Sequence, residues 1–561
     1  MTETPASSSG GDTAAPLVPP RTVPTPVALT PRPVTSVGPR AVERPADAGH
    51  TQIRILDDPT PALLDHAGGL APAGVDVMVD WWIGADDRWY FPSKEATIRQ
   101  RRLGPGPVIE TAMRIPSGDA VHRCYAVSSP KGAATVIEVN NASPVPVALA
   151  IAIRSYGIDG TPTGSHSVRL EGQSILVDDT VVVELPRRPN EAEAADTDLF
   201  RRVVEGHALT GPTSAAGDDA NLVVLYPLPH TTTLRFVVPG PEGAVPPHLP
   251  ELEQVQRGWA TLLEPGGRFV FPDAGLGDRA DAARVRILGA AIDLPDHVAN
   301  LEPGAGRLLE ALAVSGSARD CSYALGALSS AFPVRLPHAP AAAAAVVAGG
   351  AKAAAVIGDA EAATSLLEPL MQITHLVERS GDRPAAADAL GGLSLLLRLI
   401  GQHDAADDVA RSIPSGLPVG DLPDDLGALT ALSEAASSTG SWGNDELEPA
   451  VRFWLGARRQ MIDDAIDAVA ILPRFPTAWR GGNLEVHRAA TVAGPLSFAI
   501  RWHGARPALL WDLDNDDPGV VTLSCPGLDP GWTTTDRRGE TLLVGASSEL
   551  PPVPDEGDSF S

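Results

Sequence analysis

The sequence is poor in the residues that build disulfide frameworks and metal centres. Its three cysteines, Cys124, Cys321 and Cys525, stand far apart and form no Cys-X-X-Cys pair, and its 13 histidines are scattered. Such spacing excludes a disulfide-stapled fold and indicates no zinc site. We therefore expect no bound metal, and a reducing, cytoplasmic location fits this cysteine usage best.

Basic charge and long apolar runs are also scarce. A net charge of −27 leaves no basic stripe to meet a phosphate backbone, which argues against nucleic acid as a partner. No stretch approaches the roughly 20 uninterrupted apolar residues that span a bilayer, because even the run at 341–347 is short and weakly apolar. The first residues lack the basic start and the apolar run of a signal peptide. We expect neither a nucleic acid nor a membrane as a partner.

Common catalytic and cofactor motifs are missing as well. The sequence contains no GxxxxGKS/T phosphate loop, no HExxH, no GxSxG elbow and no GxGxxG fingerprint. Phosphate-loop, zinc-protease, serine-hydrolase and dinucleotide chemistry therefore have no support in the sequence. We expect no cofactor.

What the sequence does contain is a change of pattern near residue 285. The chain of 561 residues exceeds the roughly 250–300 residues that one hydrophobic core holds, so several domains are expected. Before the change the period is two, as where Leu234, Phe236 and Val238 alternate with Arg235 and Val237. Frequent turns of Gly, Pro, Asn and Asp favour a sandwich of two large antiparallel sheets.

Ala- and Leu-rich helical runs follow, and β character returns near the end. Asp359 is a predicted N-cap and Gly401 a predicted C-cap, and about seven or eight helices are expected up to residue 470. Beyond them, Leu496, Phe498 and Ile500 alternate with less apolar residues and predict a small terminal sheet.

These patterns predict a multidomain protein of helices and antiparallel sheets. The predicted segments are a disordered Pro-rich tail (1–50), a β-sandwich (51–245), a linker-helix region (246–302), an α-helical domain (303–475), a C-terminal β-sheet cap (476–547) and a disordered acidic tail (548–561). The first tail has too few apolar residues to offset its ordering entropy. Its residues 16–21 suit a polyproline ligand for a protein partner, but they also suit a Pro-rich tether that binds no partner.

Four local patterns carry a family resemblance. They are DWWIGADDRW at 80–89 with RQRR at 99–102, Trp259 with FPD at 271–273, RDCSYALGAL at 319–328, and PTAWRGGNLEV at 476–486 with GPLSFAIRWHG at 494–504. Together with the order of sandwich, linker helix and helical domain, they resemble glycoside hydrolases with an (α/α) toroid, the glucoamylase, trehalase, glycogen-debranching and rhamnosidase-like type. The resemblance implies an N-terminal β super-sandwich, a six-hairpin toroid and a role in carbohydrate metabolism.

The resemblance also implies a sugar site around Asp320. In the family motif this Asp faces the sugar at the bottom of the toroid, and Arg319 would hold it ionised through a charge-assisted hydrogen bond. Tyr323 or Trp442 would supply an aromatic surface beside the sugar. The same residues have plainer interpretations, because Asp320 also suits an N-cap and Trp442 a loop aromatic that covers the core edge.

The catalytic carboxylates are less well defined. Inverting hydrolysis needs two carboxyl groups about 6.5–9.5 Å apart, one protonated as the acid and one ionised to activate water. The family's usual acidic pairs are absent, and residues 304–471 are few for a complete toroid. Asp445 and Glu446, shortly after Trp442, are the predicted catalytic pair. Glu378 and Glu434 are weaker candidates that equally suit solvated helix faces.

Two functions therefore remain open at the level of sequence. The first is inverting, metal-free hydrolysis of an oligosaccharide or α-glucan, which the Arg319–Asp320 motif favours. The second is a catalytically degenerate protein of glycosidase fold that acts as a carbohydrate-binding or scaffold protein, which the short helical domain favours.

Overall fold

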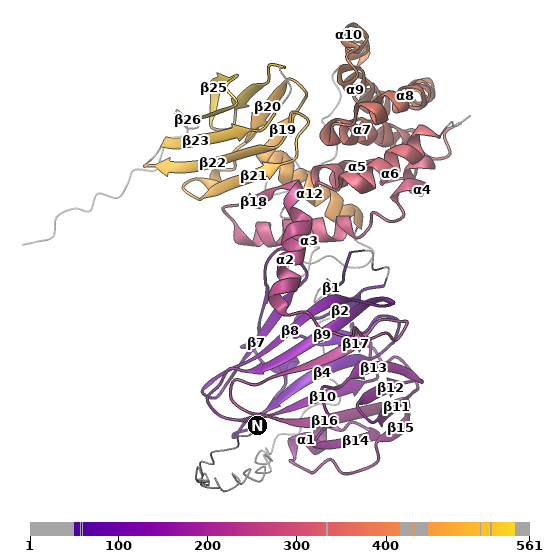
Figure 1. Cartoon of the computed structure of the whole chain (residues 1–561), viewed down its shortest axis with the longest axis vertical. Coiled ribbons are helices and arrows are strands. Elements are labelled where there is room, and N and C mark those ends of the chain that lie inside the picture. Colours follow the sequence, from indigo (N-terminus) through magenta and orange to yellow (C-terminus); the bar gives the residue numbers. More distant parts are fainter. Residues whose placement is uncertain are drawn as a thin grey trace, which may run out of the picture.

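The computed structural model is an elongated molecule with a β-sandwich at one end (Figure 1). Helices and a second β unit lie side by side at the other end. It describes residues 50–56, 58, 60–331, 335–415, 429, 447–504, 506–515 and 519–544. The predicted tails at 1–50 and 548–561 lie outside the described residues, except for His50.

Two antiparallel sheets form the N-terminal part. The eight-stranded sheet has the order β1 (Thr51–Ile53), β2 (Ala62–Leu64), β3 (Leu70–Ala71), β4 (Met78–Gly84), β10 (Val147–Arg154), β16 (Ala220–Leu228) and β14 (Glu191–Asp196), and β5 (Trp89–Tyr90) pairs with β4. The nine-stranded sheet has the order β15 (Ser214–Gly217), β11 (His166–Glu171), β12 (Ser174–Val177), β13 (Thr180–Glu184), β17 (Thr233–Pro239), β9 (Gly132–Asn141), β8 (Gly118–Ser129), β7 (Ile109–Ile115) and β6 (Arg99–Arg102). Every ladder in the two sheets is antiparallel, which confirms the predicted antiparallel sheets.

The two sheets pack face to face around one apolar core. Leu234, Phe236 and Val238 of β17 are buried in it, as their alternation predicts. The Tyr226 ring of β16 meets the Phe236 ring edge to face, with centroids 5.7 Å apart. On the opposite face of the eight-stranded sheet, α1 (Phe200–Val204) packs against Trp82. Because every second side chain of a strand is buried in this core, a slip of one residue would expose them all, and this fixes the register of each strand.

A histidine is buried between the two sheets. His122 of β8 is 1% exposed and stacks on Trp81 of β4, with ring centroids 5.2 Å apart. Burial lowers the pKa of His122 to about 3, because the imidazolium would lose its hydration inside the sandwich. The fold therefore accommodates the neutral ring.

We expect acid to destabilise the sandwich through His122. Its folded pKa lies below the usual 6.5, so the unfolded chain takes up this proton first. The contribution of the neutral His122 ring to stability should be fully present above about pH 6.5. It should fall by up to about 1.4 kcal/mol per pH unit toward pH 3. Urea titrations across this range measure how steeply the free energy of unfolding changes with pH. His122→Phe keeps a stacked ring but has no group to protonate, so this slope should be smaller by the contribution of one proton, about 1.4 kcal/mol per pH unit. An unchanged slope in this variant would contradict the assignment.

A linker helix leads away from the sandwich. α2 (Leu252–Leu263) lies on the outer face of the nine-stranded sheet, where Leu252 and Val255 pack beside Tyr125 and Val237. Arg235 of β17 donates a hydrogen bond of 3.1 Å to Glu251 at the start of the helix. These contacts attach the helix to the sheet that it follows in the chain.

Nine further helices are described beyond the linker helix. They are α3 (Ala274–Leu288), α4 (Leu294–Ala299), α5 (Ala305–Val314), α6 (Ala318–Ser329), α7 (Pro340–Ile357), α8 (Ala360–Ser380), α9 (Arg383–Leu399), α10 (His403–Ser412) and α12 (Leu447–Met461). In one column α5 packs on α7 and α7 on α9, and in the other α4 packs on α6 and α6 on α8 (Figure 1). Successive helices from α4 to α9 thus alternate between two columns.

The central helix α7 is long and apolar enough to cross a membrane, the one such helix in the described part of the chain. The sequence had indicated no such stretch, because alanine is only weakly apolar. In the fold, 56% of this helix is buried, and it lies between α5 and α9. A core helix passes the same test of length and composition as a membrane span, so the finding is weak evidence for a membrane.

The C-terminal β unit recruits strands from outside its predicted segment. Its five-stranded sheet has the order β18 (Arg268–Val270), β21 (Leu484–Ala489), β22 (Leu496–His503), β23 (Arg506–Leu513) and β26 (Arg538–Leu542). Its four-stranded sheet has the order β19 (Ile462–Asp464), β20 (Ala468–Ile471), β24 (Thr522–Cys525) and β25 (Asp529–Thr534), and β20 pairs with β24 in parallel. Strand β18 belongs to the predicted linker region, and β19 and β20 precede residue 476. Strands of only three or four residues leave little periodicity in the local sequence.

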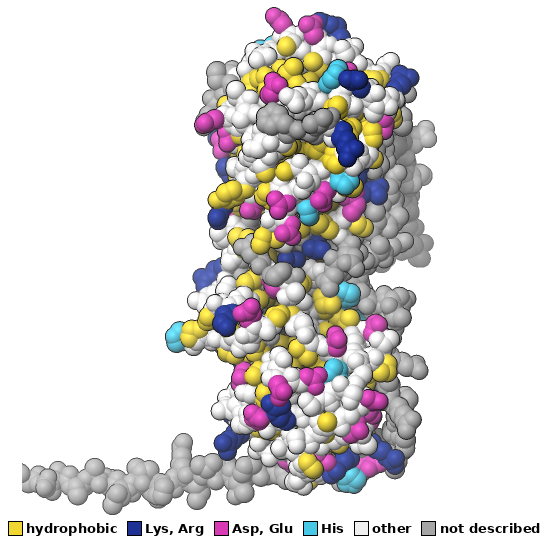
Figure 2. Space-filling view, turned by 90° about the vertical axis from the view of Figure 1, so that its right-hand side faces the viewer, with side chains coloured by type: hydrophobic (Ala, Val, Ile, Leu, Met, Phe, Trp, Pro, Cys, Tyr) yellow, Lys and Arg dark blue, Asp and Glu magenta, His cyan; other side chains and the backbone are white. Residues whose placement is uncertain are grey.

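The helices and the C-terminal sheets share one core. Trp454 of α12 is fully buried, and its ring meets Phe269 of β18 edge to face at 5.1 Å. Outside this core, acidic side chains are spread over both the sandwich end and the helical end of the face seen in Figure 2. The strong negative charge is therefore distributed along the molecule rather than collected at one end of this face.

Candidate functional site

The residues of the predicted sugar site lie on the first turns of α6. Asp320 stands in the first turn, where the Ser317 hydroxyl donates to its carboxylate. Ser317, and not Asp320, occupies the N-cap position. The Arg319 guanidinium lies 5.7 Å from the centroid of the Tyr323 ring, which is 61% exposed. The helix period thus brings Arg319 and Tyr323 together on the surface.

Of the other predicted site residues, only Glu378 lies in the described part of the chain. Trp442, Asp445, Glu446 and Glu434 lie outside the described residues. Glu378 is exposed near the end of α8. The described residues contain no group of three or more His, Cys, Asp or Glu side chains that could hold a metal ion.

A cavity of about 900 Å³ lies where the sandwich meets the helices. We call it the interdomain cavity. Its charged lining consists of Arg54, Asp58, Asp76, Asp159, Arg286, Asp293 and His297. Arg319, Asp320 and Tyr323 do not line it. Residues that are far apart in the sequence therefore meet at this one site.

Arg54 ties the two sides of the interdomain cavity together. Its side chain is buried, and its Nη2 donates to the Asp58 carbonyl at 2.8 Å and to the Gly289 carbonyl at 3.0 Å. A Cβ on residue 289 would lie 2.3 Å from the Arg54 Cζ atom. The absence of a side chain at Gly289 is therefore what allows the guanidinium to reach the end of α3.

Asp58 is the most buried carboxyl group in the cavity lining. It is 7% exposed, and its Oδ1 accepts a hydrogen bond of 3.2 Å from the Thr60 amide. Burial raises the pKa of Asp58, although the Thr60 amide and the Arg54 charge oppose the shift. Asp58 therefore retains a proton more readily than an exposed aspartate does.

A second aspartate of the cavity has the opposite tendency. Asp159 lies in an exposed loop of the sandwich and accepts hydrogen bonds from the Thr161 hydroxyl at 2.7 Å and the Thr161 amide at 3.0 Å. These bonds lower the pKa of Asp159. The cavity thus contains one carboxyl group disposed to keep its proton and one disposed to lose it.

The helical side contributes an aspartate at the start of α4. Asp293 occupies the N-cap position, yet its side chain accepts no hydrogen bond from its own helix. The side chain is exposed and lines the cavity. Near it, His297 lies 3.7 Å from Glu302. Asp293 is therefore placed to accept hydrogen bonds from a ligand.

Sequence reasoning missed these cavity residues. Asp293 precedes Leu294 and Pro295, which is an ordinary signal for the start of a helix. Asp58 and Asp159 stand in loops between strands, where Asp is common for turn geometry alone. No local signal separates these roles from ligand binding. Only the contact between the sandwich and the helices brings the three carboxyl groups to one cavity.

Comparisons with known proteins give weak similarities. No family model matches the sequence, and no curated protein matches it. Among solved structures, a bacterial glucoamylase in complex with acarbose aligns with a TM-score of 0.39 at 8% identity, over 68% of each chain. A GH92 α-mannosidase from Bacteroides thetaiotaomicron aligns with a TM-score of 0.26 at 8% identity, over 80% of this chain and 87% of that one.

Proposed function

We propose that the protein binds a carbohydrate in the interdomain cavity. The observation that carries the proposal is the lining of this cavity, where four aspartates and two arginines surround about 900 Å³. Carboxylates accept hydrogen bonds from sugar hydroxyls, and guanidinium groups donate several in a fixed plane. Ligand pockets typically measure about 300–1,000 Å³, so the cavity is large enough for an oligosaccharide.

The arrangement of the helices supports a finer proposal about the fold. Helices α4 to α9 alternate between two packed columns, as successive helices of an (α/α) toroid alternate between an outer and an inner ring. We propose that the helical part is a shortened toroid. This proposal agrees with the toroid-type glycosidases that the sequence motifs resemble.

Hydrolysis is the second candidate function, and the state of Asp58 favours it. A carboxyl group with a raised pKa is what a general acid requires, and an ionised partner would activate water. The sequence predicts Asp445 and Glu446 as the catalytic pair, and in this proposal one of them is the ionised partner of Asp58. They directly precede Leu447 in the sequence, and Leu447 lines the interdomain cavity. The proposed reaction is inverting hydrolysis without a metal.

Calorimetric titration with maltohexaose and with mannose oligosaccharides tests the binding proposal. We expect Asp293→Asn to weaken binding by about 10- to 100-fold, as for the loss of a charged hydrogen bond of about 1.5–3 kcal/mol. Asp296→Asn is the matched control, because Asp296 lies on the same helix but does not line the cavity. Equal affinity in the two variants, or no binding of any oligosaccharide to the unaltered protein, would contradict the proposal.

Release of reducing ends from the same oligosaccharides separates the two candidate functions. Turnover that disappears in Asp58→Asn or Glu446→Gln while binding persists would establish hydrolysis. Binding without turnover in the unaltered protein would instead identify a carbohydrate-binding protein of glycosidase-like layout. Far-UV circular dichroism of each variant controls for folding.

A further inference from the structure

One edge of the nine-stranded sheet has no partner strand in the described part of the chain. Strand β6 is the last in the order of this sheet and pairs only with β7. In an antiparallel ladder, about half of the backbone N–H and C=O groups of an edge strand point away from its single neighbour. The outer side of Arg99–Arg102 is therefore able to accept one more strand.

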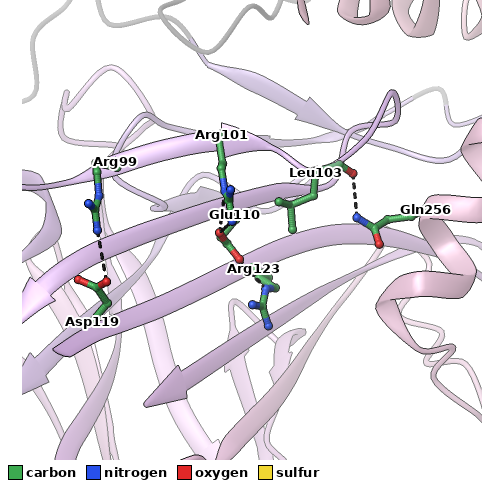
Figure 3. Close-up of polar contacts among 7 residues, drawn as sticks. All are labelled: Arg99, Arg101, Leu103, Glu110, Asp119, Arg123 and Gln256. Carbon is green, nitrogen blue, oxygen red and sulfur yellow. Dashed lines mark hydrogen bonds and ion pairs between the residues drawn. The ribbon is translucent and has the colours of Figure 1, made fainter. Parts of the chain in front are cut away.

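Arginine side chains are concentrated along this edge. Arg101 of β6 and Arg123 of β8 both bind Glu110 of β7, at 2.8 Å and 2.9 Å, so that one carboxylate orients two guanidinium groups (Figure 3). The pKa of Glu110 is lowered: burial acts to raise it, but the hydrogen bonds from these two arginines outweigh burial. Glu110 thus stays ionised and holds both arginines in place.

A second group of arginines around one carboxylate lies two residues away along β6 and four residues away along β7 and β8. Arg99 of β6 lies 3.3 Å from Asp119 of β8, and Arg114 of β7 lies 3.5 Å from the same carboxylate. Figure 3 shows the Arg99–Asp119 pair beside the Arg101–Glu110–Arg123 group. The side chains of Arg99, Arg101 and Arg114 are 67%, 71% and 61% exposed, so these guanidinium groups still face solvent. Arginines outnumber carboxylates by two here, on a chain whose net charge is −27.

The side chains of Gln100 and Arg102, which alternate with Arg99 and Arg101 along β6, anchor the strand to its surroundings. Gln100 donates to the Asp65 carbonyl at 2.8 Å and to the Thr111 hydroxyl at 2.9 Å, and Arg102 donates to the Gly106 carbonyl at 2.9 Å. At the end of the strand, the Leu103 carbonyl accepts a hydrogen bond of 3.0 Å from Gln256 of α2 (Figure 3). The strand is therefore a preformed template, and a partner would not have to order it.

We infer that β6 is a docking edge for an acidic, extended segment of a partner protein, which would add as a further strand of the nine-stranded sheet. Alternate residues of an extended chain lie about 6.8 Å apart on one face, which is also the spacing of Arg99 and Arg101 along β6. A segment with acidic residues at every second position would place its carboxylates beside these arginines while its backbone bonds to the open edge. Because this edge exposes guanidinium groups, charge complementarity favours a partner segment that carries carboxylates.

The probe is an acetylated peptide of alternating Glu and Thr, about eight residues long like an ordinary strand. Fluorescence anisotropy of the labelled peptide with the full chain measures its affinity. We expect the double variant Arg99→Gln/Arg101→Gln to bind it about 5- to 10-fold more weakly. Arg169→Gln, which removes another ion-paired arginine from β11 of the same sheet, should bind it normally. Raising salt from about 0.15 M to about 1 M should weaken binding, because the Debye length falls from about 8 Å to about 3 Å.

Two further peptides separate strand addition from simple attraction of charge. A Gln–Thr peptide of the same length tests the need for carboxylates, and a Glu–Thr peptide with alternate backbone nitrogens methylated tests the need for backbone pairing. Loss of binding with either modification supports the inference. Undiminished binding of the methylated peptide, equal losses in Arg169→Gln, or no binding of the Glu–Thr peptide would overturn it. In the last case the arginines serve only to keep the edge from pairing with other chains.

Discussion

Replacing Asp464 with alanine should destabilise the protein by about 3–5 kcal/mol, because the change leaves two buried cations without their partner. The Asp464 side chain is 1% exposed. It lies 3.0 Å from Lys352 Nζ of α7 and 3.1 Å from Arg458 Nη1 of α12, and it accepts a bond of 2.7 Å from the Val492 amide. This carboxylate thus joins two helices to the C-terminal sheets. Urea unfolding at neutral pH measures the loss.

The pH dependence of Asp464 distinguishes it from His122. Burial acts to raise the pKa of Asp464, but the charges of Arg458 and Lys352 outweigh it and hold the pKa below its usual value. Its contribution is therefore complete at neutral pH and is lost only as the pH falls below about 4, the ordinary range of an aspartate.

A neighbouring residue provides the control for the Asp464 prediction. Asp463 is exposed on the same strand, so Asp463→Ala should change stability by less than about 0.5 kcal/mol. Adding Lys352→Met to Asp464→Ala should recover part of the loss, because one unpaired cation is then removed. Similar stabilities for Asp464→Ala and Asp463→Ala would contradict the proposed role of the buried carboxylate.

Alanine at Gly349 should destabilise the helical part by about 3 kcal/mol, at the upper end for an overpacked core. A Cβ at position 349 of α7 would lie 2.0 Å from the Gly306 carbonyl oxygen of α5, and a Cβ at Gly306 would lie 2.1 Å from the backbone of Ala345. Backbone atoms cannot turn aside as a side chain can, so the two helices would have to separate. Thermal unfolding by circular dichroism measures the effect.

Adjacent glycines of α9 offer a matched comparison within one helix. A Cβ at Gly392 would lie 2.7 Å from the Ala348 Cα, whereas a Cβ at Gly391 would meet nothing within 4 Å. Gly392→Ala should therefore destabilise the protein, and Gly391→Ala should stabilise it by up to about 1 kcal/mol through helix propensity. A loss of stability in Gly391→Ala as large as in Gly392→Ala would show that close helix contact is not the cause.

Local patterns in the sequence were sufficient to predict the kinds of element. Leu234, Phe236 and Val238 alternate because one face of a strand is buried, and this period is visible in any short window of sequence. Asp359 likewise predicted a helix start, and its side chain accepts a hydrogen bond of 2.8 Å from the Ala362 amide. Local capping and periodicity depend on residues only a few positions apart, so sequence reasoning reaches them.

Long-range pairing was not predictable in the same way. Strand β18 pairs with β21, and its Arg268 bonds to His487, 219 residues further along the chain. The close approach of α5 and α7 also depends on glycines that look, in the sequence, like ordinary small residues of an Ala-rich helix. Nothing within a short window indicates which distant segment will lie against these residues.

The same distinction between local pattern and long-range contact applies to the candidate site. The sequence alone determined that an antiparallel β-sandwich precedes a set of helices and that a smaller β unit follows them, because these properties follow from the periods of strand and helix. Only the tertiary structure decided that Asp58, Asp159 and Asp293 line one cavity and that the Arg54 guanidinium bonds across it to Gly289, 235 residues away. Docking of the sandwich against the helices depends on the summed shape and polarity of two surfaces, which no local pattern encodes.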